Sequence, residues 1–174
     1  MGAGFGLVFV LVNAGALPHP VGAVLRFLGV AAFVAVLIAL RRPAHMSTPG
    51  GSAGNGVGRG YWLVVAGEVT AGVVGLVLLS GPLDAPQAAV AWITLVVGVH
   101  FCGLAVVWKQ SWFRWLGAAI ALCGALGIAL AAVGSSDGAN AAVAGVLPGV
   151  LLLVVSFRSS TSGTHSGAAR APSR

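Results

Sequence analysis

Long apolar runs alternate with shorter polar segments along the 174-residue chain. A helix needs about 20 apolar residues, range about 17 to 25, to cross a hydrocarbon core about 30 Å thick. Six runs stand out, at 2–18, 21–40, 61–80, 88–108, 115–133 and 140–157. Five of them are long enough, while the first is marginal and suits a tilted or partly inserted helix. The pattern predicts an all-α, polytopic membrane bundle of about six transmembrane helices.

Two polar segments are longer than a turn. Residues 41–60 form a stretch rich in Gly, Ser and Pro, and residues 158–174 form a polar tail. Neither can bury enough apolar surface to offset the entropy lost on ordering. We therefore predict one transmembrane domain, 1–157, with a flexible cytoplasmic loop at 41–60 and a disordered cytoplasmic tail.

Composition narrows the class of protein further. Hydrophobic residues make up 58% of the chain and charged residues 7%, whereas soluble domains carry roughly a quarter charged residues. This excludes a water-soluble enzyme, a disordered protein and a disulfide scaffold. The net charge of +6 comes from basic residues between or after the apolar runs, which argues against nucleic-acid binding.

The positions of the charges predict an orientation in the membrane, because Lys and Arg stay on the cytoplasmic side. Eight basic residues fall in three segments, which are Arg41, Arg42 and Arg59, then Lys109 and Arg114, then Arg158, Arg170 and Arg174. Asp84 and Asp137 fall on the opposite side. With six spans, both termini of this multi-pass cell-membrane protein face the cytoplasm. An aromatic belt is expected at the same interface, from Tyr61, Trp62, Trp108, Trp112 and Trp115.

Glu68 and His100 are ionisable residues inside apolar runs. Glu68 lies seven residues after Tyr61 and His100 eight residues before Trp108, about 10 and 12 Å from the same interface. The short turn between their helices makes antiparallel neighbours, so the two side chains can meet. Such a pair is either a protonatable site for transport or a structural contact that sets helix register.

Two further polar residues lie at a similar depth near the outer side, and they complete the predicted intramembrane polar site. Arg26 can extend its long side chain to the outer interface. Asn13, on the first helix, can bond to Arg26 or to a solute. Trp92, early in the fourth run, is interpreted as an anchor at the outer interface.

Small residues at regular spacing predict close helix packing. Val64, Ala71, Gly72 and Gly75 share a helix face with Glu68, which should point into the bundle. The other predicted packing residues are Gly103, then Gly117, Ala121 and Gly124, then Ala141, Gly145 and Gly149. Pro148 should kink the last helix and free a backbone carbonyl, and Cys102 and Cys123 are interpreted as packing residues.

A weak internal similarity favours two units of three helices. Residues 26–31 (RFLGVA) match 114–119 (RWLGAA), and each segment opens the second helix of its half. Because the halves would run in opposite directions, the pattern indicates a 3+3 inverted repeat, which many secondary transporters use.

The segments around Glu68 and His100 resemble a family of small multi-pass membrane proteins from high-GC Gram-positive bacteria. These pair a helix carrying Gly-Glu, here Gly67-Glu68, with a helix carrying Val-Gly-x-His-Phe, here 97–101. The family is uncharacterised, so the resemblance implies a multi-helix membrane fold and no known activity.

Two functions therefore stay open. One is a small carrier or channel-like protein with a proton-sensitive Glu68/His100 site. The other is a non-catalytic scaffold or accessory subunit that packs through its Gly/Ala faces. We expect the lipid bilayer as partner, with a homo-oligomer or larger membrane assembly as a candidate. No enzymatic activity, cofactor, metal or nucleic-acid partner is expected, and the sequence names no small-molecule substrate.

Overall fold

The computed structural model describes residues 2–41 and 58–162, and every regular element in these ranges is helical. The all-α prediction is confirmed. The elements in order are α1 (Gly2–Asn13), η1 (Ala14–Ala16), α2 (His19–Arg41), α3 (Arg59–Ser80), η2 (Pro86–Ala88), α4 (Ala89–Val107), α5 (Ser111–Ala132), α6 (Asp137–Asn140), the π-helical η3 (Ala141–Val146) and α7 (Leu147–Ser162).

Within the described residues, five helical stretches are long and apolar enough to cross a membrane. They are His19–Ala39, Arg59–Ser80, Pro86–Val107, Ser111–Ala132 and Asp137–Arg158. The chain is therefore an integral membrane protein. Helix α1 has 12 residues, so it rises only about 18 Å and is too short to span the core alone.

Several predicted boundaries differ from those of the helices. The first helix ends at Asn13 rather than near Pro18, because the chain tightens into η1 before Pro18, and α2 begins directly after it at His19. Helix α3 begins at Arg59, within the predicted loop. Helix α7 continues to Ser162, past the predicted start of the tail at residue 158. The rest of that loop and tail, 42–57 and 163–174, lies outside the described residues.

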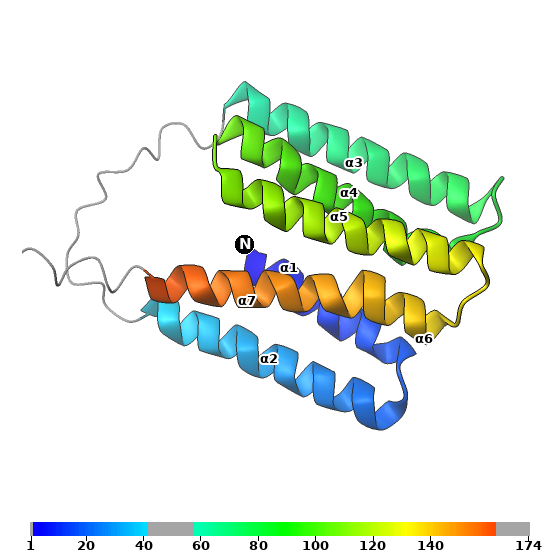
Figure 1. The fold of residues 1–174 in the computed structure, drawn as a ribbon, viewed down its shortest axis with the longest axis horizontal. Coiled ribbons are helices and arrows are strands. Elements are labelled where there is room, and N and C mark those ends of the chain that lie inside the picture. The colour runs from blue at the N-terminus through cyan, green and yellow to red at the C-terminus, as the bar shows by residue number, and fades with distance from the viewer. Residues whose placement is uncertain (1, 42–57, 163–174) are drawn as a thin grey trace, which may run out of the picture.

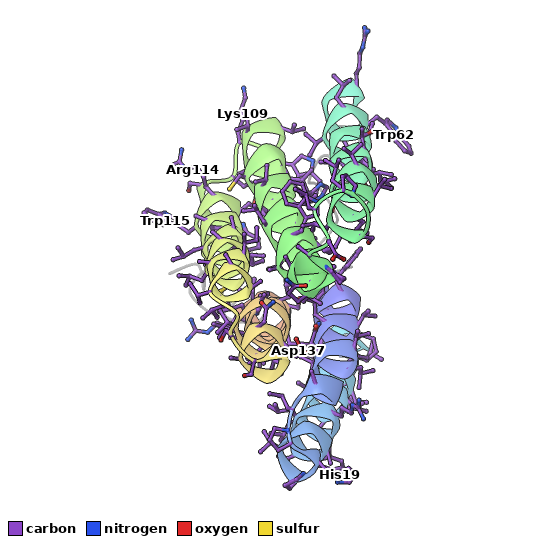
Figure 2. The ribbon with its side chains drawn as sticks, turned by 90° about the vertical axis from the view of Figure 1, so that its right-hand side faces the viewer. His19, Trp62, Lys109, Arg114, Trp115 and Asp137 are labelled. Atoms are coloured by element: carbon purple, nitrogen blue, oxygen red, sulfur yellow. The ribbon has the colours of Figure 1, made fainter. Side chains whose placement is uncertain are left out.

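The helices form two groups that differ from the predicted halves. Helices α1, α2 and α7 pack together, and α3, α4 and α5 form the second group (Figure 1). The third helix of each predicted half thus packs on the first helix of the other half, α3 on α4 and α7 on α1. Seen along the helices, α3 lies at one edge of the bundle and α2 at the other (Figure 2). The inverted repeat itself stays a prediction.

Glycines bring α4 and α5 into close contact. A Cβ atom on Gly98 or Gly124 would overlap the backbone of the facing helix, and one on Gly117 would lie 2.7 Å from the Gly98 carbonyl oxygen. Such small residues let helix backbones approach in a membrane, where dispersion contacts drive association. Beside this contact, the buried side chains of Val97, Leu116, Ile120 and Leu152 join α4 and α5 to α7.

Candidate functional site

The structure brings Glu68 and His100 together. Oε2 of Glu68 lies 2.9 Å from Nδ1 of His100, within ion-pair distance, although the contact does not meet hydrogen-bond geometry. Glu68 lies nine residues from the start of α3 and His100 seven from the end of α4, about 14 and 11 Å from the same end of the bundle. The predicted contact between neighbouring antiparallel helices is therefore present.

This pair lines a groove between α3 and α4. The groove has a volume of about 390 Å³ and opens to the surface, and the Glu68 side chain is 25% exposed and His100 14%. Its remaining wall is mainly apolar, from residues such as Leu63, Leu95 and Val99. A carboxyl and an imidazole group are thus reachable from the membrane-facing side of the bundle.

Trp92 forms part of this groove, which corrects its interpretation as an outer-interface anchor. The indole Nε1–H donates a hydrogen bond to the Ala71 carbonyl oxygen at 3.1 Å. The ring rests directly on Gly75, where a Cβ atom would overlap it. Gly72 is buried close to Ile93, whereas Ala71 is exposed, so only part of the predicted Glu68 face is turned inward.

Arg26 and Asn13 do not join Glu68 and His100, and they do not bond to each other in the described structure. The Nε–H of Arg26 donates to the Leu11 carbonyl oxygen at 3.2 Å. Asn13 is buried and donates from Nδ2 to the Phe9 carbonyl oxygen at 2.8 Å, while its side chain fills the space beside Gly145. The predicted four-residue polar site is therefore one pair plus two separate contacts between helices.

A second polar cluster, which the sequence did not indicate as a group, lies where the two helix groups meet. The π-helical segment Ala141–Val146 directly precedes α7. Pro148 has no N–H to pair with the carbonyl four residues earlier, at Ala144. The hydroxyl of Thr94, which is fully buried on α4, donates to that carbonyl. The freed carbonyl predicted from Pro148 thus has a partner on another helix.

Asn140 extends this cluster toward the α3–α4 loop. Its Nδ2 donates to the Gln87 carbonyl oxygen at 2.7 Å, and its buried Oδ1 has no hydrogen-bond partner. Gly127 of α5 lies against Oδ1, because a Cβ atom there would come within 2.8 Å of it. The start of α6 is capped by Ser136, whose Oγ accepts from the Ala139 N–H at 3.3 Å. These contacts hold the loop, α5 and α6 together.

Most of the predicted packing residues face other helices of the same chain. Gly103 lies against Val64, Gly145 against Asn13, and a Cβ atom on Gly149 would lie 2.8 Å from the Gly6 carbonyl oxygen. The stripe of Gly117, Ala121 and Gly124 contacts α4, and Ala141 is buried. The corresponding small-residue faces are used inside the bundle. Cys102 and Cys123 are free thiols, the second buried.

One end of the bundle collects basic and aromatic residues. Tyr61 stacks on Trp108 at a centroid distance of 6.4 Å, and Phe113 contacts both Trp108 and Trp112. The same end carries three basic residues, because Arg59 begins α3 and Lys109 and Arg114 lie at or next to the α4–α5 turn. The opposite end carries Asp84 and Asp137, and Figure 2 views the bundle from there.

Together these features define an α-helical integral membrane protein with an ionisable pair in a groove between two spans. In the described residues, no group of three or more His, Cys, Asp or Glu could hold a metal ion. Comparison with protein-family models, with curated proteins and with solved structures finds no match.

Proposed function

We propose that this protein is a small carrier or channel-like protein in which Glu68 and His100 form a proton-sensitive site. The observation that carries the proposal is the 2.9 Å approach of a carboxylate and an imidazole inside two spans, at the wall of an open groove. Ionisable residues within a bilayer are costly, and those found there usually serve transport or proton relay. Histidine is a common proton-relay residue in proteins.

The character of the groove limits what it could carry. Apart from Glu68, His100 and the indole of Trp92, its wall is mainly apolar, and the indole N–H is already bonded to Ala71. A sugar or another solute with many hydroxyl groups would leave most of its hydrogen bonds unmade, at a substantial free-energy cost. A proton, or a lipophilic molecule with one charged group, suits the groove better.

Proton flux into proteoliposomes tests the proposal directly. Vesicles that contain the full chain and a pH-sensitive dye receive an acid pulse, with the membrane potential clamped by potassium and valinomycin. We expect flux above that of protein-free vesicles, lost in Glu68→Gln and kept in the matched control Asp84→Asn, which changes an acidic residue in the exposed α3–α4 turn. Equal flux in the Glu68→Gln variant and the unmodified protein, or none above background, would reject the proton pathway.

A scaffold or accessory role is the second candidate, and one observation favours it. Outside its contact with α4, helix α3 has a wide uncovered face, on which Val69, Val73 and Val77 are each more than half exposed. The Gly/Ala faces first suggested for this role are already used within the chain. The uncovered α3 face would therefore have to make the contact. A purified particle with the mass of one chain, unchanged by Val73→Trp, would exclude self-association through this face.

For the arrangement in the membrane, we propose a multi-pass protein of the bacterial cell membrane, with the C-terminus and the segment between α2 and α3 in the cytoplasm. Helix α1 would then enter the bilayer from the outer side, with its N-terminus directed toward the cytoplasmic side without crossing the whole core. The resemblance to proteins of high-GC Gram-positive bacteria supports the setting. The shared end of Arg59, Lys109 and Arg114 supports the orientation, because basic residues resist translocation. Reporter fusions after Arg174 and within 42–57 should report cytoplasm, and a periplasmic signal at either place would reverse the orientation.

A further inference from the structure

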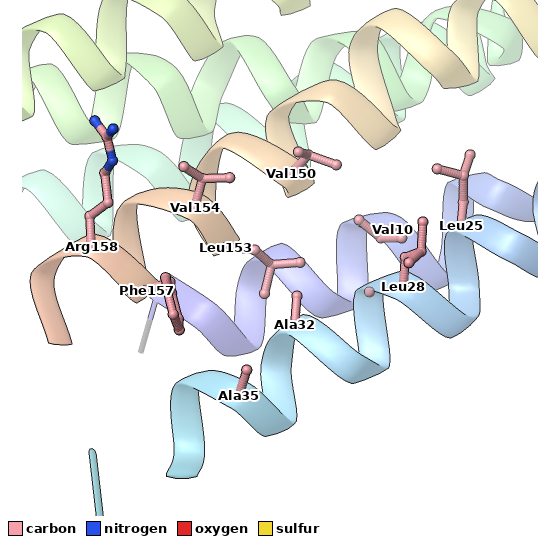
Figure 3. Close-up of a pocket in the computed structure, with 11 residues that line it drawn as sticks. Val10, Leu25, Leu28, Ala32, Ala35, Val150, Leu153, Val154, Phe157 and Arg158 are labelled. Carbon is pink, nitrogen blue, oxygen red and sulfur yellow. The ribbon is translucent and has the colours of Figure 1, made fainter. Parts of the chain in front are cut away.

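A second hollow lies on the far side of the bundle from the Glu68/His100 groove. It has a volume of about 810 Å³, opens to the surface, and is bounded by α2 and α7 with Val10 of α1 at its floor (Figure 3). Small residues on α2 create the space, namely Gly29, Ala32 and Ala35. We refer to it as the α2–α7 groove.

The wall of the α2–α7 groove is apolar except at one end. Side chains such as Leu28, Leu153 and Phe157 line its length, and Arg158 is the one charged residue among the described residues that line it. In Figure 3, Arg158 stands at the end of the row that Val150 and Val154 begin on α7. The groove thus offers hydrocarbon contact along its length and one guanidinium at its rim.

The length of this groove is close to the thickness of one leaflet of a bilayer. Along α7 it runs from Val150 to Arg158, eight residues or about 12 Å, and along α2 from Leu25 to Ala35, about 15 Å. Half of a hydrocarbon core about 30 Å thick is about 15 Å. Arg158 lies at the same end of the bundle as Arg59 and Lys109, where the headgroups of that leaflet would lie.

From this complementarity, we infer that the α2–α7 groove binds an anionic phospholipid of the leaflet on the Arg158 side. An acyl chain would lie along the apolar wall, and the phosphate would accept hydrogen bonds from the Arg158 guanidinium, a group that suits phosphate oxygens. Basic residues at the rim of such clefts bind acidic headgroups.

A second copy of the chain fits the groove less well. Two-fold pairing about an axis normal to the membrane would place each protomer's α7 beside the groove of the other. The two Arg158 side chains would then meet at equal depth as like charges. A lipid phosphate carries the charge opposite to that of a guanidinium and would approach Arg158 without this repulsion.

Lipid titration of the full chain in detergent tests the headgroup contact. Phosphatidylglycerol and phosphatidylcholine with the same acyl chains are added separately, and bound lipid is counted by native mass spectrometry. One basic contact near the membrane surface should favour phosphatidylglycerol by about fivefold. Arg158→Gln should remove this preference, and Lys109→Gln, which changes a cation at the same end but outside the groove, should keep it. Equal binding of the two lipids by the unmodified protein would overturn the inference.

Filling the groove tests the acyl-chain contact. Ala32→Trp should abolish binding of both lipids, while Ala31→Trp, at the neighbouring exposed position outside the groove, should bind as the unmodified protein does. Full binding by Ala32→Trp, or a change in oligomeric mass caused by it, would overturn the inference, the latter in favour of a second copy. Should Ala32→Trp fail to fold, a photoactivatable acyl chain on phosphatidylglycerol should label α2 and α7 of the unmodified protein; labelling elsewhere would reject the site.

Discussion

The hydroxyl of Thr94 is expected to stabilise the junction between the two helix groups, and Thr94→Val removes it with little change in shape. The hydroxyl has one hydrogen and lies within bonding distance of the Val90 and Ala144 carbonyl oxygens. Val90 belongs to the same α-helix, where its carbonyl oxygen already accepts a hydrogen bond from the backbone N–H of Thr94. In an α-helix the donor to Ala144 would be the N–H of residue 148, which proline lacks. The Ala144 carbonyl is therefore the group that the substitution leaves unpaired.

The size of the effect follows from the burial of both partners. Thr94 and Ala144 are each 0% exposed, so water cannot replace the lost donor. Interhelical hydrogen bonds in a membrane protein average about 0.6 kcal/mol and reach about 1.7 kcal/mol. A buried carbonyl group left without a hydrogen-bond donor destabilises the folded protein by about 1–3 kcal/mol. We expect Thr94→Val to lower the free energy of unfolding by about 1–2 kcal/mol.

Unfolding in mixed micelles, titrated with sodium dodecyl sulfate and followed by circular dichroism, measures this change. Thr70→Val is the matched control, because Thr70 is exposed on α3. Pro148→Ala supplies the second arm, since alanine restores the N–H that can pair with Ala144. In the Pro148→Ala background, Thr94→Val should lower the free energy of unfolding by less than about 0.5 kcal/mol. The reasoning fails if Thr94→Val resembles the Thr70 control, or if its effect is the same with and without Pro148.

Two further predictions concern stability. Glu68→Gln should leave the free energy of unfolding unchanged or raise it, because it removes a carboxylate that costs about 2.5–3.5 kcal/mol near the centre of a bilayer. The coupling energy between Glu68→Gln and His100→Ala should not exceed about 0.6 kcal/mol. A loss above that size in the same titration would make Glu68 a structural residue. Gly98→Ala should destabilise by about 1–3 kcal/mol because its Cβ overlaps the α5 backbone, whereas Gly67→Ala, with nothing within 4 Å, should be neutral or slightly stabilising. Equal thermal stability of these two variants would contradict the close α4–α5 contact.

The meeting of Glu68 and His100 was predictable because it depends on local quantities. The depth of each residue follows from its distance in sequence to an aromatic residue at the same interface, and the turn between the two helices is short. Helix rise then places them at nearly equal depth. Pro148 likewise indicates a freed carbonyl from local chemistry alone.

The partners of Trp92 and Ala144 were not predictable in the same way. A tryptophan near the end of a span can lie at the interface or against a glycine of a neighbouring helix, and the choice depends on how α4 is rotated about its axis. The donor to Ala144 comes from 50 residues away in the chain. Because lipid-facing and protein-facing sides are both apolar, hydrophobic periodicity does not reveal these rotations or which helices are neighbours.

The pairing of α7 with α1 and α2 has a consequence for how the protein is made. Helices α1 and α2 leave the ribosome first among the described elements, yet the helix that covers them comes after α3, α4 and α5. During synthesis the α1–α2 hairpin lies in the membrane before α7 is made, so the face of α1 that carries Gly6 and Val10 has no α7 to pack against. Helices α4 and α5, in contrast, can pack together as soon as both are inserted. Insertion of α7 is then the step that closes the bundle, so ribosome stalling before Asp137 should leave α1 and α2 open to the membrane chaperones and proteases that survey unfinished proteins.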